Sequence, residues 1–166
     1  MRHWLSWLAV AGLWGFALAS SARETVPPVF ERLESLAGEW EADVEGGDTV
    51  RSSYRLIANK TAVMETLNDA AHQDMTTIYH PDGEGLAATH YCSSDNQPRM
   101  RARTAGDDED SLAFETVSVT NLKSPGARHI RAIVFRFEDE DHFTQEWTQR
   151  EDGVDSVDVL HFVRKR

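Results

Sequence analysis

The stretch that decides the fold is VFERLESLAGEW, residues 29–40, where one hydrophobic spacing gives way to another. Its apolar residues recur at intervals of three and four, the spacing of a helix face: Phe30, Leu33, Leu36 and Ala37. Pro27-Pro28 can stand at the helix start, where a missing N–H costs nothing, and Gly38 can end it. The pattern predicts one short helix over about residues 28–36.

After Gly38 the apolar residues alternate with polar ones, and turn residues recur every 8 to 13 positions or so, which is typical of strands. The expected strands are at about residues 38–45, 49–57, 61–68, 74–80, 85–92, 99–104, 112–119, 128–137, 142–149 and 154–163. Ten consecutive strands with no second helix favour an up-and-down antiparallel meander, and closure removes its exposed edges. We therefore expect an all-β, roughly ten-stranded barrel with one short N-terminal helix; a two-sheet sandwich is the alternative.

The first 22 residues, MRHWLSWLAVAGLWGFALASSA, have the pattern of a secretory signal peptide. Arg2 supplies the positive start, and the apolar run from Leu5 to Ala19 is shorter than the roughly 20 residues of a spanning helix. A membrane anchor is the alternative. We expect a signal peptide at 1–22, a flexible lead-in at 23–28, a barrel domain at 29–166, and a periplasmic or secreted location.

The charge balance narrows the classes of partner that the protein can bind. The formal net charge is −11, and it becomes −12 when Arg2 is removed with the signal peptide. A surface this acidic argues against nucleic acid and anionic membranes, which both need a positive face. The chain has one cysteine, Cys92, so an internal disulfide is excluded and a buried thiol is expected. A small molecule is the expected partner.

Two sets of residues carry a resemblance. Gly38-Glu39-Trp40 after a short helix resembles the entry of lipocalin-like (calycin) barrels, in which this Trp packs near the base under an Arg late in the chain, here Arg164. VMETL (63–67), HYCSSDNQPRM (90–100) and DHFTQEW (141–147), in this order, resemble an exported bacterial lipocalin-like family of unknown function, over about residues 29–164. The resemblance implies a β-barrel and no particular chemistry.

A more distant resemblance is to nitrobindin-type haem barrels, which share the ten strands, the Gly-x-Trp start and a haem-ligating His late in the chain. His161, in VLHFVRKR, stands at the comparable place. The likeness implies haem as a cofactor held by His161. Nothing else in the sequence indicates a cofactor.

The segment from His90 to Arg103 gathers several candidate ligand-binding residues. Alternation places Arg99, Arg101 and Arg103 on one strand face, which either pairs with an anionic ligand or faces solvent. Arg99, beside the turn, is the one expected at a barrel rim. Asn96 and Gln97 serve either as turn residues or as a polar cap over the barrel mouth.

His90 and Cys92 share a strand face and could be two metal ligands, with others from His80, His129, His142 or Glu65. No CxxC, HxH or HExxH spacing supports such a site, so we assign no metal. Neighbours at i and i+2 on a strand also stand about 7 Å apart, too far for a Cys–His nucleophile pair.

Glu65 lies among apolar residues, so it either points into a polar cavity or shares an outer face with Val63 and Leu67. Trp147 shares a face with Phe143 and Gln145, which forms either plain core or the wall of a ligand site.

Three hypotheses for function follow. The first is a periplasmic binding barrel for a small, partly apolar ligand that can carry a negative charge. Its expected contacts are Glu65, His90, Asn96, Gln97, Arg99 and Trp147. The second is haem binding through His161. The third is an isomerase or lyase with Glu65 or a His as general base and Arg99 holding charge. We assign no catalytic residue.

Overall fold

The computed structural model describes residues 27–44, 46–68, 74–103 and 110–166. The expected signal peptide, 1–22, and most of the lead-in lie outside the described residues. One helix, α1 (Pro28–Ser35), precedes all the strands, as predicted. The strands are β1 (Gly38–Asp43), β2 (Thr49–Ile57), β3 (Ala62–Asn68), β4 (Asp74–Asp82), β5 (Gly85–Tyr91), β6 (Gln97–Ala102), β7 (Ser111–Thr120), β8 (His129–Phe137), β9 (His142–Glu151) and β10 (Val154–Arg164). A short 3₁₀ turn, η1 (Ala58–Lys60), joins β2 to β3.

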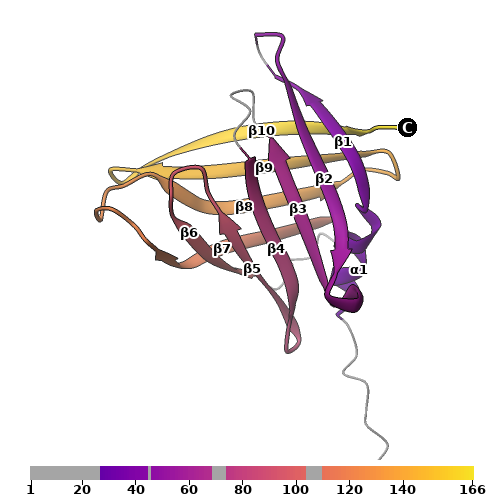
Figure 1. Cartoon of the computed structure of the whole chain (residues 1–166), viewed down its shortest axis with the longest axis horizontal. Helices are drawn as coiled ribbons and strands as arrows, with labels where there is room; N and C mark the ends of the chain where they lie inside the picture. Colours follow the sequence, from indigo (N-terminus) through magenta and orange to yellow (C-terminus); the bar gives the residue numbers. More distant parts are fainter. Residues whose placement is uncertain (1–26, 45, 69–73, 104–109) are drawn as a thin grey trace, which may run out of the picture.

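Every strand pairs antiparallel with its neighbours in sequence, and β10 returns to pair with β1, so the sheet closes into a ten-stranded barrel. The predicted fold class is confirmed, and the sandwich alternative is wrong. Figure 1 shows β1 to β4 running steeply in this view, whereas β8 to β10 run across the molecule. Among the described residues, no helix has the length and apolar character that a membrane-crossing segment needs.

One expected boundary moves. The strand expected from residue 99 begins at Gln97, and the β5–β6 turn occupies Ser93–Asp95, with Asp95 in the left-handed region at φ 63°. Gln97 and Pro98 already belong to β6 and pair with β7. Alternation along β6 therefore buries Pro98 and Met100 and sends the arginines outward.

The helix covers one end of the barrel, which we call the packed end. Phe30 and Leu33 of α1 are fully buried. Beneath them Trp40, Phe143 and Phe162 pack ring against ring, with Trp40–Phe143 centroids 4.7 Å apart edge to face and Phe143–Phe162 centroids 4.9 Å apart in a stack. Aromatic pairs in these geometries contribute beyond the area that they bury.

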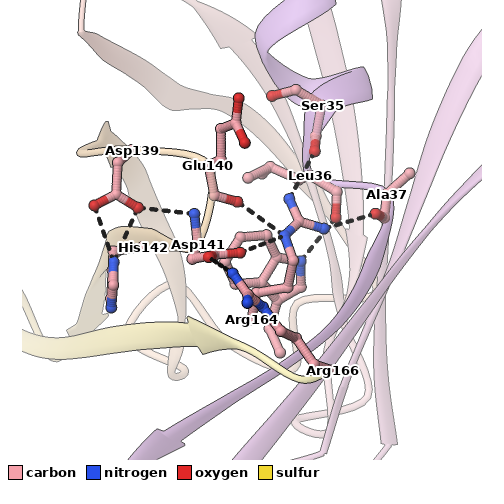
Figure 2. A network of polar contacts seen from close by, with 10 residues as sticks. Ser35, Leu36, Ala37, Asp139, Glu140, Asp141, His142, Arg164 and Arg166 are labelled. Carbon is pink, nitrogen blue, oxygen red and sulfur yellow. Dashed lines mark hydrogen bonds and ion pairs between the residues drawn. The ribbon is translucent and has the colours of Figure 1, made fainter.

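Arg164 stabilises the packed end through several contacts (Figure 2). Its guanidinium lies 4.1 Å above the Trp40 ring and donates to three backbone carbonyls, those of Ser35, Ala37 and Glu140. The Trp–Arg contact that the resemblance implies is therefore present. Gly38 makes room for it: its φ is +136°, and a Cβ there would stand 2.9 Å from Arg164 Nη1.

The seam between β1 and β10 is short. Only two residue pairs join these strands, Trp40 with Arg164 and Glu41 with Val163, whereas ten pairs join β10 to β9. Beyond Glu41 the two strands diverge, which fits their different directions in Figure 1. The far end of the barrel, which we call the pocket end, is therefore open along one side.

Candidate functional site

A pocket of about 940 Å³ lies at the pocket end. Its volume is near the top of the roughly 300–1,000 Å³ range of small-molecule sites. Its apolar wall comes from six strands and the residue after β1: Val44, Val50, Leu67, Met75, Ile130, Trp147, Val157, Val159 and Leu160. Cys92, Ser93 and Ser94 contribute the β5–β6 turn. The barrel therefore offers a concave surface on which apolar and polar groups have about equal shares.

The pocket occupies the gap that the diverging seam leaves. All residues of β10 from Val157 to His161 line it, although successive residues of a strand point to opposite faces. The edge of β10 must therefore face the pocket, since one face alone would supply only alternate residues. Asp43 and Val44 border the gap on the β1 side.

Charged groups of both signs stand at the pocket mouth. Arg128 donates to the Gln149 side-chain oxygen, and the Gln149 amide donates to Asp158. Asp43, on the opposite side, accepts from the Thr49 hydroxyl. Arg128, Asp43 and Asp158 are all exposed, so the mouth can meet either sign of charge without burying an ion.

A polar layer separates the pocket from the packed end. Glu65 points inward and is fully buried, which settles the even choice that the sequence left. Tyr54 donates to Glu65 Oε1 at 2.7 Å and Tyr79 to Oε2 at 2.6 Å. The Gln145 amide and the Ser52 hydroxyl also donate to Oε1, at 3.1 Å and 3.4 Å. With both oxygens occupied, Glu65 acts as the centre of a buried network.

Burial raises the pKa of Glu65, and the four donors oppose that rise. Burial also raises the pKa of Tyr54 and of Tyr79 well above the usual phenol range, with the neighbouring Glu65 carboxylate adding to the effect. Both phenols therefore stay protonated and keep donating to the carboxylate.

His90 and Trp147 meet between this layer and the pocket. Cross-strand pairing aligns Glu65 of β3, Thr77 of β4 and His90 of β5 side by side on the inner face. The His90 and Trp147 rings lie 5.0 Å apart at 57°, and Trp147 belongs to the pocket wall. Burial alone lowers the pKa of His90 to about 4, so its imidazole is neutral at physiological pH.

The other predicted ligand contacts are dispersed. Asn96 is buried, and its amide donates to the Arg128 carbonyl at 2.9 Å, which ties the β5–β6 turn to the start of β8. Gln97 lies near the surface and accepts from Thr120 and Asn121. Arg99 is exposed on the outer face of β6, away from the pocket lining.

Glu65, His90 and Arg99, whose convergence would favour the enzyme hypothesis, do not form one cluster, because Arg99 points outward. Glu65, His90 and Trp147 do come together in the interior, and of the predicted contacts Trp147 is the one that lines the pocket.

His161 is exposed at the edge of β10, where it borders the pocket. The Thr144 hydroxyl donates its single proton to Glu138 and lies 2.9 Å from His161 Nδ1. The hydroxyl must then accept from Nδ1–H, which leaves a lone pair on Nε2. Haem binding by His161 stays a prediction.

Cys92 is half-buried at the pocket rim rather than buried as expected, because it directly precedes the exposed β5–β6 turn, which its backbone closes with Asn96. Within the described ranges, no group of three or more His, Cys, Asp or Glu side chains is placed to hold a metal ion.

The sequence interpretation missed Ser52, Tyr54, Thr77 and Tyr79, which build the polar layer. A signal was present, since Ser52 and Thr77 are polar residues at the inward positions of strands whose other inward residues are apolar or aromatic. Comparison with protein-family models finds no match, and comparison with curated proteins finds no detectable relative.

Proposed function

We propose that the chain is a binding protein for a small, partly apolar molecule held at the pocket end of the barrel. The observation that carries this proposal is the pocket of about 940 Å³, whose wall combines eight aliphatic side chains, Met75 included, with the ring of Trp147. Burying a ligand there removes apolar area from water on both sides, which favours binding by roughly 25 cal/mol per Å² before the entropy of association is subtracted.

The mouth supports a ligand with one polar end. Arg128 and the two aspartates are exposed there, so a charged or polar group can remain hydrated while the apolar part enters. Arg128 replaces Arg99 as the cation that would meet an anionic group.

A fluorescent apolar probe tests the proposal. We expect N-phenyl-1-naphthylamine to bind the full chain saturably with one site, with increased emission. Alkylation of Cys92 with benzophenone-4-maleimide places a bulky group at the rim, and we expect it to weaken probe binding at least ten-fold. No saturable binding, or unchanged binding after alkylation, would contradict the proposal.

The matched control moves the label to the outer surface. In a Cys92→Ser, Val117→Cys variant the same reagent reacts on β7 at a side chain that is 61% exposed and outside the pocket lining. Its probe affinity should equal that of the unlabelled protein.

Haem is a second candidate ligand, because His161 borders the pocket and keeps a lone pair on Nε2. Titration with haemin should then give a Soret band that His161→Ala loses. We also propose export through residues 1–22. Cell fractionation should find the full chain outside the cytoplasm and a chain lacking residues 1–22 inside it.

A further inference from the structure

Two polar nitrogens, one on a ring in the pocket wall and one on the ring packed against it, have no hydrogen-bond partner among the described residues. They are Trp147 Nε1 and His90 Nε2, on side chains that are 4% and 0% exposed. A buried donor without a partner costs about 1–3 kcal/mol, so native proteins keep few of them without a reason. The two rings contact each other, which concentrates the cost in one place.

Either tautomer of His90 leaves one unpaired group, on Nε2. The Thr77 hydroxyl oxygen lies 2.8 Å from His90 Nδ1, and the same hydroxyl lowers the pKa of the Tyr79 phenol through a side-chain hydrogen bond. If the hydroxyl donates to Nδ1, Nε2 carries an unpaired N–H. If Nδ1–H donates instead, the hydroxyl can donate to Tyr79, and Nε2 presents an unpaired lone pair. The Trp147 N–H is a donor in both cases, and a ligand hydroxyl can meet either form of Nε2.

The charge around these nitrogens selects the partner. The Glu65 carboxyl is buried in the same row of the strand register as His90, two strands away. Burial lowers the pKa of His90 to about 4, and the cation that lines the pocket, Arg128, is exposed at the mouth. A carboxylate placed against the two nitrogens would be buried beside neutral groups, in the same interior as the Glu65 carboxyl, which is costly.

We propose that Trp147 and His90 form the inner anchor of the pocket and bind an uncharged oxygen of the ligand, a carbonyl or a hydroxyl. This inference rests on the proposed binding function and adds the chemistry of the group that enters first. Neither nitrogen is exposed, so the oxygen reaches them when the Trp147 side chain shifts within the wall. The ligand then replaces the contact between the rings with hydrogen bonds.

Three probes of one shape test the anchor: butyrophenone, butylbenzene, which has CH₂ in place of the carbonyl, and 4-phenylbutyrate, which ends in a carboxylate. Each competes with N-phenyl-1-naphthylamine for the full chain. The measured quantity is the affinity of butyrophenone divided by that of butylbenzene, which cancels the apolar contribution. We expect this ratio to fall about 5- to 10-fold in Trp147→Phe, the size of one neutral hydrogen bond.

Trp40→Phe is the matched control, because the Trp40 N–H already donates to the Leu36 carbonyl at the packed end. It should leave the ratio unchanged. An equal ratio in the wild type and Trp147→Phe, with the naphthylamine still bound, would overturn the anchor and leave the binding function standing. If the wild-type protein does not bind the naphthylamine, both the anchor and the binding function are overturned. A stronger dependence on Trp147 for 4-phenylbutyrate would overturn the uncharged oxygen.

A measurement on the unaltered sequence covers the case in which Trp147→Phe fails to fold. In ¹⁵N-labelled protein, the indole N–H resonance of Trp147, assigned through its own backbone, should move downfield with butyrophenone and stay in place with butylbenzene. The Trp40 resonance should stay in place with both. A stationary Trp147 resonance under saturating butyrophenone would refute the anchor.

Discussion

Two buried tryptophans of the same barrel differ in hydrogen bonding. Trp40, at the packed end, is 1% exposed, donates to the Leu36 carbonyl at 2.7 Å and lies beneath Arg164. Trp147, at the pocket end, is 4% exposed and has no hydrogen-bond partner within the described part of the chain. Strand β9 passes through both regions, with Phe143 in the packed end, Gln145 in the polar layer and Trp147 at the pocket. The packed end is built for stability, and the pocket end keeps unpaired groups that a ligand can use.

The largest expected effect is at the packed end. Phe143→Ala removes a ring that contacts Trp40, Tyr54, Phe135 and Phe162, so it should lower the free energy of unfolding by about 3–5 kcal/mol. Leu67→Ala, in the pocket wall, enlarges an existing hollow and should cost about 2 kcal/mol. Urea unfolding measures both. Equal losses of unfolding free energy in the two variants would contradict the difference in packing between the two ends.

The next largest expected effect is a dependence of the free energy of unfolding on pH. The pKa of His90 is lowered to about 4 by burial, so the folded chain resists protonation that the unfolded chain accepts near pH 6.5. Stability present above pH 6.5 should be lost as the pH falls towards 4, by about 3 kcal/mol for this group. His90→Gln should lack this part of the acid destabilisation. Urea unfolding at pH 7 and pH 4 gives the difference, and parallel pH profiles of the two proteins would refute it.

Arg164→Ala should cost about 2 kcal/mol, because three carbonyls lose a charged donor and Trp40 loses its cation. Arg164→Lys keeps the charge but not the planar fork, and should recover only part of the loss. Thermal unfolding ranks the three proteins. A lysine variant as stable as the wild type would show that charge alone fastens the packed end.

The smallest expected change in stability gives the most direct test of the difference between the two tryptophans. Trp40→Phe leaves the Leu36 carbonyl unpaired and should cost about 1–2 kcal/mol. Trp147→Phe removes a donor that has no partner among the described residues. Relief of that cost opposes the packing lost with the smaller ring, so the free energy of unfolding should change by no more than about 0.5 kcal/mol. Urea unfolding without ligand measures both. A large loss in Trp147→Phe would reveal a hydrogen bond that the structure does not contain.

The fold could be predicted from the sequence because alternation and turn residues are local signals. All ten strands appear where the pattern places them, with shifts of a few residues at their ends. The direction of Glu65 could not be predicted, since either face of VMETL satisfies alternation. Its inward position depends on Tyr54 and Tyr79, which lie on neighbouring strands and enter only through the register.

The pocket itself was beyond prediction for a related reason. Val50, Leu67, Ile130 and Leu160 look like ordinary core residues in the sequence, and only the divergence of β1 from β10 leaves them around a hollow. That divergence is a property of how the barrel closes, which no single strand encodes. Arg99 illustrates the converse, because a conspicuous charge at a turn proved to be part of the outer surface.

The short seam also orders the events of folding. Trp40 and Arg164 pair across nearly the whole described chain, so this contact carries a larger loop-closure entropy than any hairpin of the meander. The hairpins from β2 to β10 can form locally and early, while closure waits until Val163 and Arg164 have left the ribosome. A ribosome-bound chain that stops before β10 would hold most of the sheet yet lack one wall of the pocket. Binding competence should therefore arrive in a single late step.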